Sequence, residues 1–393
     1  MADKKISLLD TLNALKKDGA RVGALDDFNR TPDAFTTGNI GLDYRIGCGG
    51  YPKGRIVEQY GPKSSGKTTS ALQAMAKEQA ICIATGEGYV MFLDYEKALD
   101  DKYARALGID TSHPTFIYAM PDTFEEGANY YRKLLATGEL RIAVFDSVAS
   151  MITESETEKD TGSRNVADRA LMLHQFCRQI TPVLERTQST AIFLNHMMIK
   201  VDTSPIGQRM AAQGIKQKTK PGGEALNFYA SLIIEFQQIK HLSATVHDPL
   251  TNEKTKMKTQ TDTRAIIVKN KVGTPQGTVD LRIRYGKGFS QAYSVLQVLL
   301  GYGHVKKKSA QTYVFSEELR HPDNDQTTFS GGESAVLTAM EESPYWLEIL
   351  EVKAREILDG AGDLSDAALN ATNDVEEDDG SDSIGGYVAG LDD

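Results

Sequence analysis

The chain has 393 residues, of which 40% are hydrophobic and 25% are charged, and its formal net charge is −10. This composition is ordinary for a soluble protein of more than one domain. The sequence contains no run of about 18 apolar residues, so it predicts no membrane-spanning helix and no membrane partner.

The N-terminal segment MADKKISLLD lacks the apolar core of a signal peptide. Cys48, Cys82 and Cys177 lie far apart and form no C-x-x-C pair, which favours a reduced, cytoplasmic protein. The histidines show no zinc-ligand spacing, and we expect no zinc site.

The first predicted element is a short amphipathic helix. Residues 6–17, ISLLDTLNALKK, place their apolar side chains at helical spacing, and a polar linker follows at 17–32. The helix could pack on the core of its own chain or on a neighbouring subunit, and the pattern leaves both open.

Residues 61–68, GPKSSGKT, match the G-x-x-x-x-G-K-[ST] pattern of a phosphate-binding loop. An apolar strand precedes the loop and a helical stretch without Gly or Pro follows it, which is the required context and argues against a simple surface turn. Lys67 would reach the β- and γ-phosphates of ATP, and the Thr68 hydroxyl would bind Mg²⁺. The predicted nucleotide contacts are Gly61, Pro62, Lys63, Ser64, Ser65, Gly66, Lys67, Thr68 and Thr69.

Apolar strands alternate with helical stretches from about residue 38 onward. The predicted strands are 55–59, 89–93, 115–119, 142–145, 190–194, 230–236 and 264–269. Several are almost continuously apolar, as parallel strands covered on both faces must be. The pattern predicts an α/β fold with a mainly parallel central sheet, followed by a small separate domain after about residue 290.

The last twenty residues account for most of the net negative charge. Residues 374–393 hold eight acidic side chains and no Lys or Arg, and removing those eight charges from −10 leaves −2 for the rest. The stretch has too few large apolar residues to form a core, so we predict a disordered acidic tail. The tail could solubilise the protein or regulate it.

Two further acidic residues follow apolar strands. Asp146 ends IAVFD and would order the hydration shell of Mg²⁺. Glu96 follows FLDY, and because parallel strand ends meet at one crevice, it is placed to polarise a water molecule as general base. Either could instead be a surface acid, since apolar strands that end in an acid are common.

Six segments occur in the order and spacing of the RecA family: GGYPKGRIVEQYGPKSSGKTTSALQAMA, FLDYEKALDDKYARALGID, VFDSVAS, IFLNH, GGEALNFYAS and VKNKVGTP. The resemblance is close over about residues 38–290 and looser at the N-terminal helix and up to about 360. The chain thus resembles a RecA-type recombinase. This implies an ATP-dependent protein that forms helical filaments on single-stranded DNA and exchanges strands with homologous double-stranded DNA, with single-stranded DNA-binding and mediator proteins as accessory partners.

The resemblance implies four parts of the chain. Residues 1–37 would be an N-terminal helix and linker for subunit contact, and 38–290 an ATPase and DNA-binding core. Residues 291–360 would form a small C-terminal α/β domain, and 361–393 the acidic tail.

The resemblance also implies roles for residues at matching positions. Lys67, Thr68 and Asp146 match the family's phosphate and magnesium ligands, and Glu96 matches its catalytic glutamate. The matches to the family's adenine contacts are Asp100, Tyr103 and Tyr285. Lys269 and Lys271 match lysines that reach the γ-phosphate of the neighbouring subunit, although alternate strand residues could equally be a solvated face.

DNA would be bound by two loops after strands near the site. The first, at about 156–169, carries Arg164 and Arg169, and the second, at about 197–223, is rich in Gly, Gln and Lys. Such basic loops suit phosphate binding, although a bare run of charge is more often solvated. The second loop's candidate DNA contacts are Lys200, Arg209, Lys216, Lys218, Lys220, Gly222 and Gly223.

The sequence departs from the family in two places. His196 stands where the family usually has Gln, at the position that links the γ-phosphate to the second loop, so the coupling there would use an imidazole. The second loop is also longer than in bacterial members. These departures suggest a divergent member of bacterial or phage origin, which would act in the cytoplasm of a bacterial or phage-infected bacterial cell.

Two alternative functions remain open. One is a hexameric helicase or motor on the same core, and the other is a DNA-binding accessory factor without ATPase activity. The Lys269–Lys271 pair favours a filament over a ring, and the complete set of Lys67, Thr68, Glu96 and Asp146 argues against an inactive factor.

Overall fold

A computed structural model describes residues 7–20, 22, 32–157, 166–199, 218–247, 250, 252–273 and 277–360. Within these residues, a nine-stranded sheet has the order β13-β12-β11-β10-β3-β7-β6-β4-β5. The six strands from β10 to β5 are parallel to one another, and β11, β12 and β13 continue the sheet through antiparallel pairs. The expected α/β fold with a mainly parallel sheet is confirmed.

The parallel strands are β3 (Ile56–Gly61), β4 (Tyr89–Asp94), β5 (Phe116–Ala119), β6 (Leu140–Asp146), β7 (Thr190–His196) and β10 (Leu232–His247). The antiparallel strands are β11 (Lys254–Asn270), β12 (Gly277–Arg284) and β13 (Gly288–Phe289). The strands expected at 230–236 and 264–269 are much longer in the structure, because β10 and β11 continue beyond the core as a polar ribbon. β12 was not expected from the sequence.

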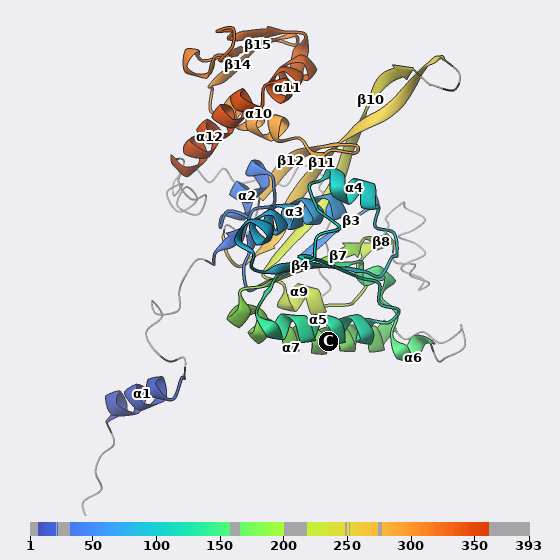
Figure 1. Ribbon diagram of the computed structural model, residues 1–393, viewed down its shortest axis with the longest axis vertical. Coiled ribbons are helices and arrows are strands. Elements are labelled where there is room, and N and C mark those ends of the chain that lie inside the picture. The colour runs from blue at the N-terminus through green and yellow to red at the C-terminus, as the bar shows by residue number, and fades with distance from the viewer. Residues whose placement is uncertain are drawn as a thin grey trace, which may run out of the picture.

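Helices cover both faces of the sheet (Figure 1). One face packs on α2 (Ile40–Ile46), α3 (Lys67–Thr85) and α4 (Asp101–Ala106), and the other on α5 (Phe124–Thr137), α7 (Val166–Thr187) and α9 (Ala225–Tyr229). Neighbouring strand residues point into opposite layers, so Val57 belongs to the first core and Ile56 to the second. Burial on both faces explains why these strands are almost continuously apolar.

The C-terminal lobe has its own core around the fully buried Trp346. It consists of α10 (Gln291–Gly301), β14 (Val305–Ser309), β15 (Thr312–Phe315), β16 (Thr328–Ser330), α11 (Gly332–Glu342) and α12 (Pro344–Gly360), with a 3₁₀ turn at Glu317–Leu319. The three strands form an antiparallel sheet. Arg282 of β12 joins the lobe to the main sheet, because its guanidinium contacts Asp262 at 2.7 Å and Glu333 at 2.5 Å.

Shorter elements complete the described chain. They are β1 (Ala34–Phe35) paired with β2 (Tyr51–Pro52), β8 (Met198–Ile199) paired with β9 (Lys218–Thr219), a 3₁₀ turn at Val148–Ser150, and α6 (Glu154–Thr157).

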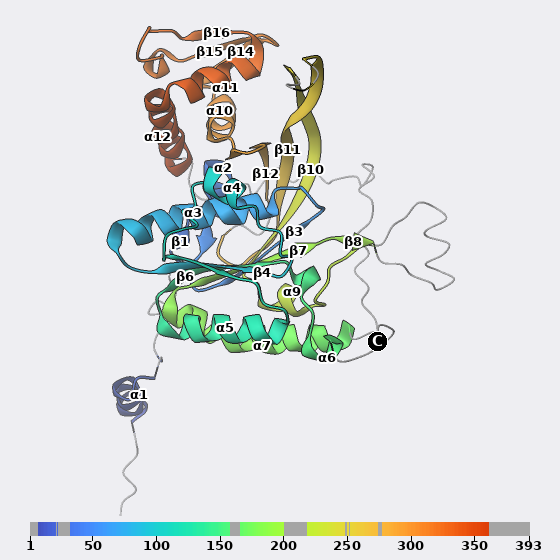
Figure 2. The same cartoon turned by 45° about the vertical axis from the view of Figure 1, so that its right-hand side comes forward.

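The N-terminal helix α1 (Leu8–Lys17) lies away from the rest of the protein in both views (Figures 1 and 2). Leu8 is 78% exposed and Leu9 is 66% exposed, so its apolar face is uncovered. Among the described residues, no helix is long and apolar enough to cross a membrane. The predicted acidic tail, 361–393, lies outside the described residues.

Candidate functional site

Four neighbouring parallel strands bring the predicted site together. In the sheet order β3-β7-β6-β4, the phosphate-binding loop follows β3, His196 ends β7, Asp146 ends β6 and Glu96 follows β4. The C-terminal ends of parallel strands lie at one edge, which is where ligands bind in α/β sheets.

The two glycines of the phosphate-binding loop are required by its geometry. Gly61 has φ of 154°, and a Cβ there would lie 2.2 Å from the Phe236 carbonyl oxygen. Gly66 has φ of 100°, and its Cβ would lie 2.4 Å from Ile283 Cδ1. Ser65 Oγ is buried in the loop and has no hydrogen-bond partner among the described residues. A phosphate oxygen would satisfy this hydroxyl, so the loop fits a phosphate group.

Lys67, the first residue of α3, is buried and folded back onto the loop. Its Nζ donates to the carbonyl oxygens of Gly61 at 3.1 Å and Pro62 at 2.7 Å. Burial lowers the pKa of Lys67 to about 8, although the negative charges of Asp146 and Glu96 act against this shift. The backbone carbonyl groups of the loop therefore hold the Lys67 ammonium group in place.

Thr68 and Asp146 form an oxygen pair at the start of α3. Thr68 Oγ1 donates to Asp146 Oδ2 at 3.0 Å. Burial raises the pKa of Asp146 to about 7, and the nearby negative charge of Glu96 adds to this effect. A hydroxyl and a carboxylate are ligands that Mg²⁺ prefers, so these two residues could hold that ion.

Glu96 is held by side chains from two other strand ends. Its Oε1 accepts from Ser147 Oγ at 2.5 Å and lies 2.8 Å from His196 Nε2. Burial pushes the pKa of Glu96 upward, but the hydrogen bonds from Ser147 and His196 outweigh it and hold the pKa below its usual range. The carboxylate is thus ionised at neutral pH, as a general base must be. A cavity of about 480 Å³ here is lined by Lys63, Tyr95, Glu96, Ala149, Ser150, His196 and Met197.

Asp94 orients the turn that carries Glu96, and sequence reasoning assigned it no role. It is 1% exposed. Its carboxylate accepts from the backbone N–H groups of Glu96 at 3.1 Å and of Ala98 and Leu99 at 2.9 Å, and from Tyr118 Oη at 2.9 Å. The only signal in the sequence is an acid at the end of an apolar strand.

A buried ion pair lies behind His196. Glu58 of β3 is 1% exposed, and its Oε2 lies 2.7 Å from Lys220 Nζ. Its other oxygen accepts from Asn195 Nδ2 at 3.1 Å. Lys220 Nζ also donates to Asn227 Oδ1 at 2.8 Å and lies 4.4 Å from the centre of the Tyr60 ring. The ammonium of Lys220 is therefore engaged inside the protein.

The two predicted cross-subunit lysines lie near the end of β11. Lys269 Nζ donates to the carbonyl oxygens of Asn227 at 2.5 Å and Phe228 at 3.2 Å. Burial, followed by the like charge of Lys271, holds the pKa of Lys269 below its usual range. These contacts connect Lys269 to α9. Lys220 contacts the same helix, because its ammonium donates to the Asn227 side chain.

The predicted adenine contacts lie on two elements. Asp100 caps α4 by accepting from the N–H groups of Lys102 and Tyr103, and Tyr103 Oη lies 2.7 Å from Thr69 Oγ1 beside the phosphate-binding loop. Tyr285, which follows β12, is 47% exposed. Its hydroxyl lies 2.6 Å from Thr261 Oγ1. Tyr103 therefore contacts the start of α3 beside the phosphate-binding loop, whereas Tyr285 contacts β11.

Much of the predicted DNA-binding set lies outside the described residues. This applies to Arg164, Lys200, Arg209 and Lys216, and nothing is described of the Lys218 side chain. Arg169 pairs with Glu156 at 2.8 Å. Gly222 and Gly223 have φ of 88° and 63°, a conformation that glycine adopts most readily.

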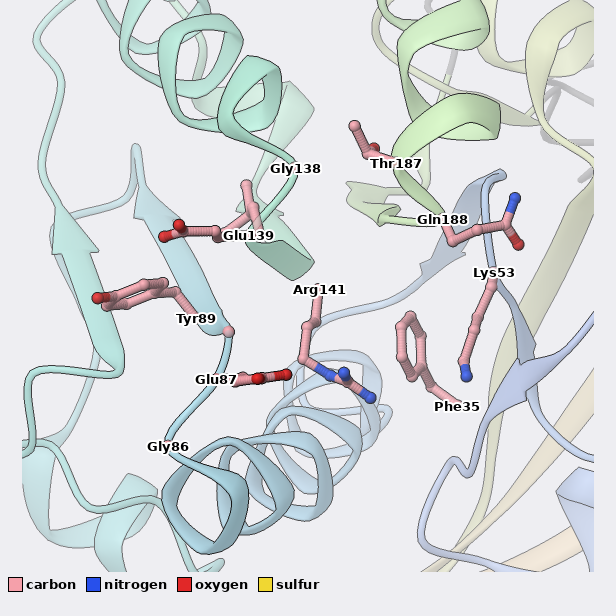
Figure 3. A pocket seen from close by; sticks show the side chains of 12 residues that line it. Phe35, Lys53, Gly86, Glu87, Tyr89, Gly138, Glu139, Arg141, Thr187 and Gln188 are labelled. Atoms are coloured by element: carbon pink, nitrogen blue, oxygen red, sulfur yellow. The ribbon is translucent and has the colours of Figure 1, made fainter.

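A second cavity lies at the opposite ends of the strands (Figure 3). Its volume is about 510 Å³, and Lys53, Tyr89 and Arg141 are among its lining residues. Arg141 is already paired with Glu78 at 2.8 Å, and Lys53 lies over the Phe35 ring. This cavity is separate from the phosphate-binding loop and carries none of the predicted site residues.

Comparisons with known proteins point to a single family. Residues 13–290 match the family model described as RecA N-terminal domain. The chain is 34% identical over 378 residues to Protein RecA of Corynebacterium glutamicum, covering 95% of this chain and 91% of that protein. It is 35% identical to Protein RecA of Corynebacterium efficiens over 95% of this chain and 88% of that protein. It is 36% identical to Protein RecA of a Mycobacterium species over 75% and 78% of the two chains.

The first prediction concerns Lys67. Replacing it by alanine should lower ATP hydrolysis by about 100-fold or more, because the loop loses the cation that would face the phosphates. Hydrolysis would be measured by phosphate release, with circular dichroism to verify the fold. Lys77→Ala, on the exposed side of the same helix, is the matched control and should hydrolyse ATP normally. A Lys67→Ala protein as active as Lys77→Ala would contradict the assignment.

Proposed function

The chain belongs to the RecA family, and on that premise we propose that it is an ATP-dependent recombinase. It would assemble as a helical filament on single-stranded DNA and exchange strands with a homologous duplex, in recombination and repair. The observation that carries this proposal is the 2.8 Å contact between Glu96 and His196. This contact connects the predicted hydrolytic carboxylate to the strand that leads into the predicted DNA loop.

The residues of the site would divide the chemistry of ATP hydrolysis. Lys67 and the loop N–H groups would bind the β- and γ-phosphates, with Ser65 as a further donor. Thr68 and Asp146 would hold Mg²⁺, which when bound neutralises charge on the phosphates. Glu96 would orient a water molecule and accept its proton, which is consistent with a carboxylate kept ionised by Ser147 and His196.

His196 would report the state of the nucleotide to the second loop. Its Nε2 contacts Glu96, whereas its Nδ1 is buried and has no hydrogen-bond partner among the described residues. Its neighbour Asn195 reaches Glu58 and the carbonyl oxygen of Pro221, on the returning side of the second loop. A shift of Glu96 would therefore be transmitted along β7 to both ends of that loop.

Contacts between subunits would complete the filament. We assign residues 1–37 to this role, since α1 presents the exposed Leu8 and Leu9 away from its own core. Lys269 would leave its carbonyl partners on α9 and, together with Lys271, reach the γ-phosphate of the neighbouring subunit. Asp100, Tyr103 and Tyr285 would contact the adenine. Residues 38–290 would be the catalytic core, 291–360 a separate small domain and 361–393 an acidic tail.

The remaining partners follow from this activity. We expect ATP, Mg²⁺, single-stranded DNA and a homologous duplex, together with single-stranded DNA-binding and mediator proteins. The place of action would be the cytoplasm of a bacterial or phage-infected bacterial cell, where such DNA is found.

The proposed function is tested by combining hydrolysis with electron microscopy. Single-stranded DNA should stimulate ATP hydrolysis, and with a slowly hydrolysed ATP analogue the protein should form helical filaments along that DNA. Closed six-membered rings would instead favour a helicase or motor. DNA binding without any stimulated hydrolysis would favour an accessory factor.

A further prediction separates nucleotide binding from the coupling of the nucleotide to DNA affinity. His196→Ala should still bind ATP but lose the ATP-dependent gain in affinity for single-stranded DNA, because Glu96 would no longer contact β7. His196→Gln should recover part of the gain, since an amide can donate to the Glu96 carboxylate. The measurement is DNA affinity with and without a non-hydrolysable analogue. A full gain in the alanine variant would show that His196 is not the coupling residue.

Lys220 would anchor the second loop rather than contact DNA. Breaking a buried ion pair by removing one partner costs about 3–5 kcal/mol, so Lys220→Met should lower the free energy of unfolding substantially. Combining it with Glu58→Gln should cost less than the sum of the two single changes, because neither partner is then left charged and alone.

The salt dependence of DNA binding distinguishes the two roles. Each phosphate contact contributes roughly 0.7 to the log–log salt slope on single-stranded DNA. The slope should stay unchanged in Lys220→Met and fall in Lys218→Met, which removes a predicted DNA contact two residues away. An equal fall in both variants would make Lys220 a phosphate contact and overturn the anchoring role.

A further inference from the structure

The outer part of the β10–β11 hairpin projects beyond the sheet as a two-stranded ribbon (Figures 1 and 2). β10 pairs with β3 only from Leu232 to Glu235, and β11 pairs with β12 only from Gln260 onward. Beyond these points the two strands pair only with each other, along 243–247 and 254–258. An isolated two-stranded ribbon is marginally stable in water, so packing of the core does not account for it.

One face of this ribbon is cationic. The residues paired across it are Ser243 with Lys258, Thr245 with Lys256, and His247 with Lys254. Directly paired residues share a face, and so do alternate residues of a strand, so all six side chains point to the same side. All six are exposed. We call this set the ribbon face.

The ribbon face contains no acidic partner of its own. The two paired segments, SATVH and KTKMK, include no carboxylate. Among the described residues, no carboxylate lies within ion-pairing distance of its three lysines, whereas Lys240 near the base pairs with Asp262 at 3.5 Å. The three ammonium groups are therefore available to an anionic partner, in a protein whose net charge is −10.

We propose that the ribbon face binds double-stranded DNA, with the ribbon lying in the major groove. The major groove, about 12 Å wide, admits a two-stranded β-ribbon. Lysines two residues apart on a strand are separated by about 6.7 Å, so three of them can reach successive phosphates along the groove wall. The hydroxyls of Ser243 and Thr245 are further donors to phosphate oxygens.

The chemistry of the ribbon face also predicts binding without sequence preference. The ribbon face has no Arg, Asn or Gln, whose planar groups bind base edges through two parallel hydrogen bonds, and its lysine ammonium groups act as point charges toward phosphates. A surface that holds any duplex suits a search for homology. The proposal rests on the proposed recombinase function, and it adds a site for the incoming duplex apart from the two predicted DNA loops.

The test uses the full chain assembled on single-stranded DNA. Lys254→Gln, Lys256→Gln and Lys258→Gln are combined, and capture of a labelled heterologous duplex is followed by fluorescence anisotropy over a range of salt. Each lost phosphate contact should lower the log–log salt slope by about 0.9, so a fall of roughly 2–3 is expected, with weaker duplex binding. DNA-stimulated ATP hydrolysis should be unchanged.

A matched variant controls for the loss of charge. Lys77→Gln, Arg132→Gln and Lys133→Gln remove three exposed charges from α3 and α5, and duplex capture should be retained. Replacing the three ribbon lysines by arginine should also retain it. An unchanged slope in the ribbon variant, or a loss equal to that of the control, would overturn the proposal. If single-stranded DNA does not stimulate ATP hydrolysis by the unmodified protein, the recombinase function itself is refuted.

Two outcomes address the competing explanations. Lysines also protect exposed strand edges from pairing with other chains, and a variant that self-associates while keeping duplex capture would show that this is their role. Bulky groups on C5 of the pyrimidines, which project into the major groove, should weaken capture by the unmodified protein. Equal capture of such duplexes would overturn the placement in the major groove.

Discussion

The hydrogen bond between His196 and Glu96 joins two strand ends on which the rest of the site depends. Glu96 follows β4, His196 ends β7, and β6 with Asp146 lies between these strands in the sheet. The three positions meet because parallel strands buried between two helical layers end at the same edge. A nucleotide that moved Glu96 would thus alter its contact with β7, the strand that leads into the second loop.

A buried charge lies behind this edge of the sheet. Glu58 lies in the middle of the sheet at 1% exposure, and such a charge is tolerated only with partners that satisfy it. Lys220 and Asn195 supply them. Because these partners come from the two sides of the second loop, the points where the chain enters and leaves that loop are both held by one buried carboxylate.

The inner and outer parts of β10 and β11 have different surroundings. β10 is buried from Leu232 to Phe236 and largely exposed beyond. Where β3 and β12 flank the pair, apolar side chains fill the two cores. Where those neighbours end, the edges of the strands are open, and the ribbon face carries hydroxyls, lysines and a histidine. The ribbon is therefore a surface feature built on a rigid base, which is the arrangement that binding surfaces commonly have.

The sequence by itself determined the phosphate-binding loop and the α/β class, because both depend on local order: a strand, a loop and a helix that are contiguous, and strands apolar enough to be buried on both faces. It also placed Glu96 and Asp146 at strand ends. Only the tertiary structure decided which side chains meet there. Ser147 lies 51 residues from Glu96, and Lys220 lies 162 residues from Glu58. In the sequence Lys220 resembles the other lysines of its loop, and it differs from them because the fold sets a buried carboxylate beside it. The ribbon was missed for a related reason, since exposed polar strands carry no periodic pattern of burial and their pairing is set by the partner strand.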